Sequence, residues 1–344
     1  MTEVPGLNVA GLTAWLDEAH PDLARDELTA TVIAGGRSNL TYAVEGASMP
    51  LIVRRPPLGH VLSSAHDMRR EHRVISALAG SAVPVPAAID VVDDTDEHLV
   101  TGTTFFVMQR APGRVLAHPA QNANYSPAGL RALSKELIRD LADLHAIEPA
   151  SVGLGDFGRP DGYLERQLST WRRQLDASRS RDTPELDALQ ASLANDTPVA
   201  TRASIVHGDY RLDNALVVGD SDSPHISAIL DWEMATLGDP FVDLGIFALY
   251  WEIADLPGAS GAVPSAVDAA AGYPSFEELV EIYAERAGTG IPDLRWYRAF
   301  AAYKLAVILE GIHFRYQAGD TVGEGFDRIG ALVAPLASKG LEVR

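Results

Sequence analysis

The segment from Ile205 to Asn214, Ile-Val-His-Gly-Asp-Tyr-Arg-Leu-Asp-Asn, constrains this chain more than any other part of its sequence. It places Asp209 two residues after His207 and five residues before Asn214. Short apolar runs precede and follow this loop, and a third run ends directly at Asp231. We therefore expect a strand, the loop, a second strand, a turn, a third strand and then the acid.

This spacing predicts an enzyme that transfers a phosphoryl group. Such an enzyme needs an acid that orients the acceptor hydroxyl, ligands for Mg²⁺, and positive charge near the phosphates. In protein kinases the acid is followed five residues later by an Asn that binds metal, and a separate Asp completes the metal site. Asp209 is thus the predicted base, Asn214 and Asp231 are the predicted ligands of Mg²⁺, and ATP is the predicted donor. His207 is expected to support the loop.

Three further residues are interpreted from their positions around this loop. Arg211 completes the predicted catalytic set, and two alternatives stay open for it: contact with the γ-phosphate, or a bond to Asp213 or another carboxylate. Asp243 is expected to hold the loop through hydrogen bonds rather than to bind metal. His145 is expected to pack or to form hydrogen bonds rather than to bind a ligand.

These motifs resemble those of the aminoglycoside phosphotransferase and choline kinase-like family, and the resemblance covers nearly the whole chain. The family's mark is His-Gly-Asp, an Asn five residues after that Asp, and a later Asp-Trp-Glu, here residues 231–233. Leu-Ile-Val-Arg-Arg-Pro-Pro at 51–57, Ser-Ala-His at 64–66 and Arg70-Glu71 narrow the resemblance. They are similar to the kinase-like domain that some long proteins carry ahead of an acyl-CoA dehydrogenase.

The expected fold class is α+β, a two-lobed protein-kinase-like fold. Residues 1–110 are expected to form an N-lobe with a small antiparallel sheet, one helix and the nucleotide-binding loop. Residues 111–344 are expected to form a mainly helical C-lobe with the catalytic loop, the metal site and the acceptor pocket. A length of 344 residues is sufficient for two lobes, and 47% hydrophobic content supports sizeable cores.

A glycine-rich tip lies between apolar flanks early in the chain and predicts a hairpin over residues 32–43. Glycines allow backbone N–H groups to approach anionic oxygens, and a side-chain hydroxyl or amide can add donors. The predicted phosphate contacts of this tip are Gly35, Gly36, Ser38 and Asn39. An ordinary hairpin turn is the alternative reading.

A strand over residues 51–53 is expected to deliver Arg54 to the position where kinases place a phosphate-binding lysine. The sequence has no lysine before residue 135, and a guanidinium can bind phosphate through two parallel hydrogen bonds. Arg55 should point to the other face of the strand. Glu71 lies on the apolar face of a helix predicted over residues 65–79, where a carboxylate needs a cation, and an arginine on the neighbouring strand is its expected partner. A partly exposed Glu at the rim of that face is the alternative.

The segment from Gln109 to Gly113 is expected to connect the lobes. Backbone groups of this connection, at Gln109 and Ala111, are the predicted contacts to the adenine edge. Later helices are predicted from Pro127, with Ser126 as its N-cap, and over residues 275–287 and 295–317. By contrast, the stretch 178–201 is polar and is expected to be surface.

Composition narrows the classes of partner. The formal net charge is -19, which argues against nucleic acid and anionic membranes. There is no cysteine, so disulfides and thiolate metal sites are excluded. The longest strongly apolar stretch is too short to span a bilayer, so no membrane anchor is expected. We expect a cytoplasmic monomer or homodimer that binds a nucleoside triphosphate and a small hydroxyl acceptor.

The acceptor stays open at this point. The dehydrogenase-associated resemblance implies a hydroxy acid or a hydroxyacyl-CoA, whereas the wider family allows aminoglycosides, choline, amino-alcohols or sugars. A non-catalytic nucleotide-binding or regulatory module is the hypothesis from another class, because the usual lysine is missing. The presence of Asp209, Asn214 and Asp231 together argues against it.

Overall fold

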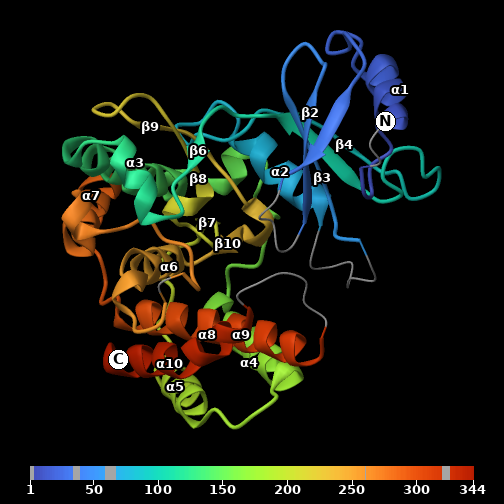
Figure 1. Cartoon of the computed structure of the whole chain (residues 1–344). Coiled ribbons are helices and arrows are strands. Elements are labelled where there is room, and N and C mark those ends of the chain that lie inside the picture. The colour runs from blue at the N-terminus through green and yellow to red at the C-terminus, as the bar shows by residue number, and fades with distance from the viewer. Residues whose placement is uncertain (1–3, 34–38, 59–66, 260, 320–325) are drawn as a thin grey trace. The chain divides into compact units, whose positions relative to one another are not determined.

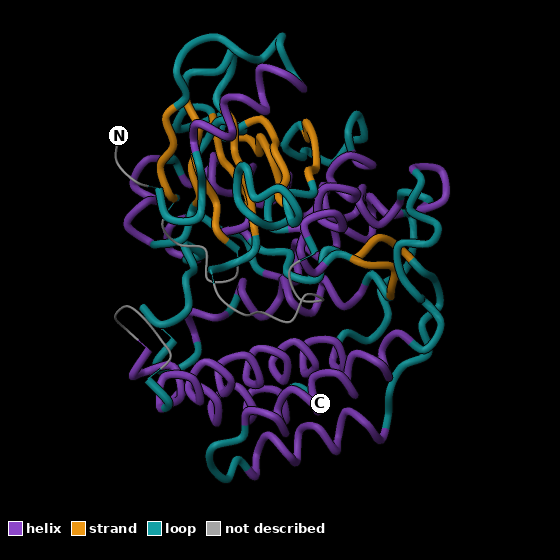
Figure 2. Tube along the Cα trace, turned by 90° about the vertical axis from the view of Figure 1, so that its right-hand side faces the viewer, coloured by secondary structure: helices purple, strands orange, loops and turns teal. Residues whose placement is uncertain are grey.

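The chain forms two compact units in the computed structural model (Figures 1 and 2). The first unit comprises residues 1–112 together with 227–233, and the second comprises 113–226 and 234–344. The residues that the structure describes are 4–33, 39–58, 67–259, 261–319 and 326–344. The division expected at residue 110 does not include the return of the chain to the first unit at residue 227.

An antiparallel sheet organises the first unit (Figure 1). Its strand order is β1-β2-β3-β5-β4, and every neighbouring pair is antiparallel. The strands are β1 Thr29–Val32, β2 Leu40–Glu45, β3 Leu51–Arg55, β4 Ala88–Val92 and β5 Phe105–Gln109. Alternate residues of β2, β3 and β5, among them Tyr42, Val53 and Phe105, form one core cluster with leucines of helix α1 (Val9–Ala19).

Helix α2 (Met68–Leu78) packs against β4 and β5. It begins at Met68 because the Asp67 carboxylate accepts the backbone N–H groups of Arg69 and Arg70. The predicted alternation at the end of β3 is confirmed. Arg55 donates to the carbonyls of Gly6 and Thr101 at 3.0 Å each, whereas Arg54 binds the α2 carboxylate described below.

The second unit is mainly helical, and α8 is its central helix because α4, α5, α6 and α10 all pack against it. The α-helices among its described residues are α3 Pro127–Ala146, α4 Tyr163–Ser178, α5 Pro184–Asn195, α6 Phe241–Trp251, α7 Phe276–Ala287, α8 Arg295–Gln317, α9 Phe326–Ile329 and α10 Val333–Glu342. Two small sheets complete the fold. One pairs β7 Ser204–Val206 with β10 Thr236–Gly238. In the other, β8 Ala215–Val218 lies between β6 Arg114–Val115 and β9 His225–Ile229.

Most of the predicted helices of this unit are confirmed. Ser126 accepts the N–H of Gly129 and caps α3, and Ser275 accepts the N–H of Glu278 and caps α7. The bounds of α8 agree with the predicted residues. Residues 178–201 lie mostly at the surface, as expected, but helix α5 within them was not predicted, and its Leu186, Leu189 and Leu193 are buried. Within the described ranges, no helix is both long and apolar enough to cross a membrane.

Asp94 organises the loop between β4 and β5. Its buried carboxylate accepts the backbone N–H groups of Leu99, Val100, Thr101 and Gly102 at 2.6–2.9 Å. Burial alone would raise the pKa of Asp94, but these four hydrogen bonds outweigh it and hold the pKa below its usual range. The ionised carboxylate therefore stabilises the first unit.

We expect Asp94→Asn to lower the free energy of unfolding by about 2 to 3 kcal/mol at neutral pH, since an amide oxygen replaces a charged acceptor of four amides. A depressed pKa contributes stability above the ordinary pKa of Asp, and this stability is lost as pH falls through the folded pKa. The difference from wild type should therefore shrink in acid. Urea denaturation across pH measures it. Asp96→Asn, at an exposed neighbouring position, is the control; equal effects of the two changes would contradict the role of Asp94.

Candidate active site

The His-Gly-Asp segment follows directly after β7, in the second unit. Gly208 has a φ of +84°, and a Cβ at this position would lie 2.9 Å from Cβ and O of Met234. Both the left-handed backbone and the lack of space require glycine here. The turn that leads to Asp209 is therefore determined by backbone packing.

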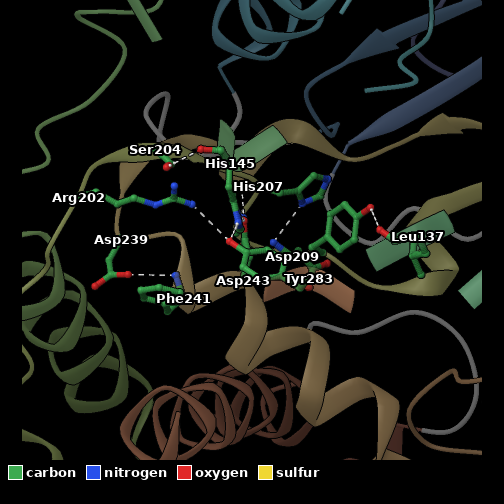
Figure 3. Close-up of polar contacts among 12 residues, drawn as sticks. Leu137, His145, Arg202, Ser204, His207, Asp209, Asp239, Phe241, Asp243 and Tyr283 are labelled. Carbon is green, nitrogen blue, oxygen red and sulfur yellow. Dashed lines mark hydrogen bonds and ion pairs between the residues drawn. The ribbon is translucent and has the colours of Figure 1, made fainter. Parts of the chain in front are cut away.

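Asp243, in the first turn of α6, holds this turn from inside the protein (Figure 3). Its carboxylate is fully buried and accepts the N–H of His207 at 2.7 Å and the N–H of Gly208 at 2.8 Å. His145 Nε2 lies 3.2 Å from the same carboxylate, and its Nδ1 lies 2.8 Å from the hydroxyl of Tyr283. The expectation that Asp243 holds the loop, and that His145 forms hydrogen bonds in the core, is confirmed.

The charges of this cluster follow from its burial. Burial lowers the pKa of His145, although Asp243 opposes the fall. For Asp243 burial alone would raise the pKa, but the hydrogen bonds from His145 and from the amide of Gly208 hold the pKa below its usual range. Asp243 is thus an ionised acceptor beside a histidine that stays neutral, and it can anchor two backbone amides at neutral pH.

Asp209, the predicted base, is partly exposed, with 23% of its side-chain surface accessible. The Nδ2 group of Asn214 donates to the Asp209 carboxylate at 3.0 Å and to its carbonyl at 2.9 Å. The N–H of Asp209 donates to Nδ1 of the buried His207 at 3.2 Å. Three of the predicted residues thus lie together, and the carboxylate is oriented while it keeps access to solvent.

Arg211 lies beside two acids of the same loop. Its Nη2 is 3.1 Å from Asp213 and its Nε is 3.4 Å from Asp209. The guanidinium carbon lies 4.3 Å from the ring centroid of Tyr250, in a cation–π arrangement. Of the two alternatives, the structure describes the contact with carboxylates.

A second group of predicted residues lies in the first unit. Nη1 of Arg54 is 2.6 Å from the carboxylate of Glu71, of which only 1% is exposed. Nη2 of Arg54 is 3.5 Å from Asp231. Burial raises the pKa of Glu71 to about 7, against the charge of Arg54, which lowers it. The predicted pairing of Glu71 with an arginine on the neighbouring strand is confirmed.

Asn39 and the turn at Asp231 belong to the same unit. Nδ2 of Asn39 donates to Glu233 at 2.9 Å, and the indole N–H of Trp232 donates to the carbonyl of Ile229 at 2.9 Å. Asp231 has a φ of +66°, which is uncommon for a residue with a side chain and favours a functional role. Oδ1 of Asn39 and Nε of Arg54 are buried and have no hydrogen-bond partner in the described structure.

The remaining predicted nucleotide contacts are less constrained. Gln109 is the last residue of β5 and donates its N–H to the carbonyl of Ala87 at 2.8 Å, and Ala111 follows in the connection after the strand. Gly35, Gly36 and Ser38 lie outside the described residues. Their roles stay predictions.

The two predicted metal ligands, Asp231 in the first unit and Asn214 in the second, each carry an oxygen of the kind that Mg²⁺ uses beside phosphates. In the part of the chain that the structure describes, no group of three acidic, histidine or cysteine side chains is arranged to hold a metal. Mg²⁺ does not need one, because it keeps several waters and uses one or two protein oxygens beside substrate phosphates. The carboxylate of Asp231 and the amide oxygen of Asn214 are hard donors of this kind, and the Asn214 nitrogen is already used by Asp209.

One residue beside this site was missed by the sequence analysis. Lys304 of α8 is buried, and its ammonium donates to the carbonyl of Gly208 at 2.5 Å. The sequence could have indicated its burial, because Lys304 lies between Phe300 and Val307 on the same apolar face of a helix.

The pair of Arg54 and Glu71 yields a stability prediction. Arg54→Met leaves a carboxylate buried without its cation and should lower the free energy of unfolding by about 3 to 5 kcal/mol. A folded pKa above the unfolded value makes stability fall as pH rises through that interval, and loss of Arg54 extends the fall to higher pH. Urea denaturation at about pH 6 and about pH 9 should therefore show the larger loss at the higher pH.

The double change Arg54→Met with Glu71→Leu should recover most of the stability, because no unpaired charge remains. Arg69→Met, which breaks an exposed pair with Asp93, is the matched control and should cost less than about 1 kcal/mol. A double variant as unstable as the single one would show that the buried charge is not the cause.

Comparisons with known proteins show the family to which the chain belongs. The sequence profile described as "Phosphotransferase enzyme family" matches residues 29–300. Acyl-CoA dehydrogenase family member 11 of Gallus gallus is 34% identical over 328 residues, which is 94% of this chain and 41% of that protein. The chain thus spans about two fifths of the length of this curated relative.

Solved structures show the same fold. A crystal structure from Ralstonia eutropha, assigned as an aminoglycoside phosphotransferase, is 32% identical, with a TM-score of 0.81 and 98% of both chains covered. A thermostable mutant of aminoglycoside phosphotransferase APH(4)-Ia, in a ternary complex with AMP-PNP and hygromycin B, has a TM-score of 0.59 at 16% identity and covers 97% of this chain and 98% of its own. The latter likeness shows the fold alone. The predicted kinase-like fold class is confirmed, and the chain belongs to the phosphotransferase enzyme family.

Proposed function

We propose that the chain is an ATP- and Mg²⁺-dependent phosphotransferase that acts on the hydroxyl of a small molecule. The observation that carries this proposal is the partly exposed carboxylate of Asp209 on a loop whose backbone is anchored by a buried acid. A base for phosphoryl transfer needs this combination of access and fixed position. The family assignment supports a kinase-type enzyme. The proposals of ATP as donor, of Mg²⁺ and of a hydroxyl acceptor rest on the site residues.

In this proposal Asp209 orients the acceptor hydroxyl and takes its proton. The hydroxyl oxygen bonds to the γ-phosphorus of ATP as the bond from that phosphorus to the β–γ bridging oxygen breaks, and ADP leaves. Asn214 orients the carboxylate of Asp209 through its amide nitrogen. Asn214 and Asp231 are the proposed ligands of Mg²⁺, which when bound neutralises charge on the phosphates. His207 keeps the loop in place by accepting the N–H of Asp209. Arg211 restrains the loop through its acids.

The first unit supplies the proposed nucleotide contacts. Arg54 is held by Glu71 and still has a buried Nε without a partner, which suits a phosphate oxygen. Asn39 uses one N–H of its amide on Glu233, and its Oδ1 is an acceptor, so the proposed contact to phosphate comes from the second N–H of the amide. Gly35, Gly36 and Ser38 are proposed to add donors to the phosphates, and backbone groups at Gln109 and Ala111 to bind the base.

The acceptor that the relatives favour is a hydroxy acid or a hydroxyacyl-CoA, since the curated relative carries an acyl-CoA dehydrogenase name and its length exceeds this chain. An aminoglycoside or amino-alcohol is the second candidate, favoured by the name of the Ralstonia eutropha structure and by the net charge of -19, which suits a cationic acceptor. A non-catalytic nucleotide-binding module would still bind nucleotide through Arg54 and the other proposed contacts of the first unit. Its function would not require the carboxylate of Asp209. Cytoplasmic location and a monomeric or homodimeric state stay predictions.

Asp209→Asn should lower kcat by about 10² to 10⁴-fold, because the amide cannot take the proton. The KM for ATP and the Kd for Mg·ADP should stay within about threefold of wild type, since this residue is not proposed to bind nucleotide. ADP formation measures the rates, and calorimetry measures the binding. Asp222→Asn in an exposed turn is the control. An unchanged kcat in Asp209→Asn would remove Asp209 as the base.

An acceptor panel separates the candidate functions. ADP formation from Mg·ATP would be followed with hydroxybutyryl-CoA, hydroxybutyrate, hygromycin B and choline. We expect turnover with one of the first two compounds. Turnover with hygromycin B or choline alone would overturn the preferred acceptor, and binding of Mg·ADP without turnover of any compound would favour the nucleotide-binding module.

A further inference from the structure

Lys304 is a buried cation, which is costly, and its hydrogen-bond partner is a backbone carbonyl. The sequence contains three lysines, Lys135, Lys304 and Lys339. Lys135 forms an ion pair with Glu278 at 3.2 Å and keeps 32% of its side chain exposed. Lys304 lies inside the second unit, on the central helix α8, with 7% of its surface exposed.

Among the residues that the structure describes, the ammonium of Lys304 contacts one carbonyl, one sulfur and one aromatic ring, and it has no ion pair with a carboxylate. It donates to the carbonyl of Gly208 at 2.5 Å, it lies 3.6 Å from the sulfur of Met234, and it lies 5.4 Å from the ring centroid of Trp171. Burial lowers the pKa of Lys304, and Asp209 and Asp243 oppose the fall through their charges. The shortest of these contacts is the hydrogen bond from the ammonium to the carbonyl of Gly208.

A backbone carbonyl does not need an ammonium. A neutral donor or an ordered water satisfies a buried carbonyl at lower cost, whereas a buried charge must be taken out of water. A methionine in place of Lys304 would fill the same space and would remove the cost of the buried charge, but it would leave the carbonyl of Gly208 without this donor. These two effects oppose each other, so stability alone does not account for a lysine here.

The Gly208 carbonyl belongs to the peptide that leads into Asp209. The N–H of Gly208 is held by Asp243 of α6, and its carbonyl is held by Lys304 of α8. Between these two bonds the backbone has the left-handed φ of +84° that only glycine adopts readily. The two contacts fix both polar groups of one residue from two different helices.

We propose that Lys304 is a positioning residue for phosphoryl transfer: by holding the carbonyl of Gly208, it sets the plane of the following peptide and hence the place of the Asp209 carboxylate. The inference rests on the proposed function, because a precise position for Asp209 has a purpose only if that carboxylate acts as the base. A displacement of about 1 Å in a reacting group can cost about 10²-fold in rate.

Lys304→Met is the deciding variant, with Lys135→Met as the matched surface control. We expect Lys304→Met to lower kcat by about 10 to 100-fold while the KM for ATP and the Kd for Mg·ADP stay within about threefold. Its midpoint of thermal unfolding should stay close to that of wild type, because removal of the buried charge and loss of the donor to the Gly208 carbonyl have opposite effects. Lys304→Gln keeps a neutral donor and should have a kcat between those of wild type and Lys304→Met.

A merely structural role predicts a different pattern. In that case Lys304→Met loses thermal stability while kcat per folded molecule is unchanged, and this result overturns the proposal. Equal kcat values for Lys304→Gln and Lys304→Met would show that a donor to the Gly208 carbonyl is unimportant, and this result would also overturn the proposal. If Lys304→Met does not fold, the kcat of Lys304→Gln against wild type decides: an unchanged value overturns the proposal and a reduced value with unchanged Kd supports it.

Failure of this proposal is distinguishable from failure of the proposed function. The reference is ADP formation by wild type and Asp209→Asn with Mg·ATP and the acceptor panel. If wild type turns over and Asp209→Asn does not, the kcat of Lys304→Met tests Lys304 alone. If wild type is inactive, hydrogen exchange of the peptide covering residues 205–214 tests the positioning directly: faster exchange in Lys304→Met than in Lys135→Met supports it, and equal exchange overturns it.

Discussion

The buried carboxylate of Asp243 is the interaction on which the candidate active site depends. It receives two backbone amides of the His-Gly-Asp turn and the ring of His145, so that α3, the turn and α6 meet at one charge. A charge without solvent access persists only where donors surround it, and these donors cannot move independently. The position of Asp209 therefore follows from the interior of the second unit, not from the preferences of an exposed loop.

The same physical device recurs in the first unit. Asp94 gathers four backbone amides of one loop, and Glu71 holds the guanidinium of Arg54. In each case a buried acid gains its stabilisation from donors that are thereby fixed in place. The difference lies in what is fixed: Asp94 orders the backbone between two strands, whereas Glu71 orients a cation that keeps an unpaired N–H. Only the second arrangement leaves a group that can bind a ligand.

Features governed by local rules could be predicted from the sequence. Alternation along a strand placed Arg54 and Arg55 on opposite faces, and capping residues located the starts of α3 and α7. Helix α5 was missed because its leucines are separated by polar residues, so that average polarity concealed a spacing of three and four. The roles of Lys304 and of residues 227–233 depend on contacts between distant parts of the chain, and no local pattern encodes them.

The charge balance of the first unit bears on the form in which a nucleotide would bind. Burial is the main cause that raises the pKa of Glu71, the charges of Asp231 and Glu233 raise it further, and among the described residues Arg54 opposes them. A polyanion arriving without a counterion would add to this negative charge and would compete with Glu71 for Arg54. A divalent cation carried with the phosphates would offset part of that charge. If the proposed nucleotide binds at this unit, its metal complex is therefore the form that adds less negative charge beside Glu71.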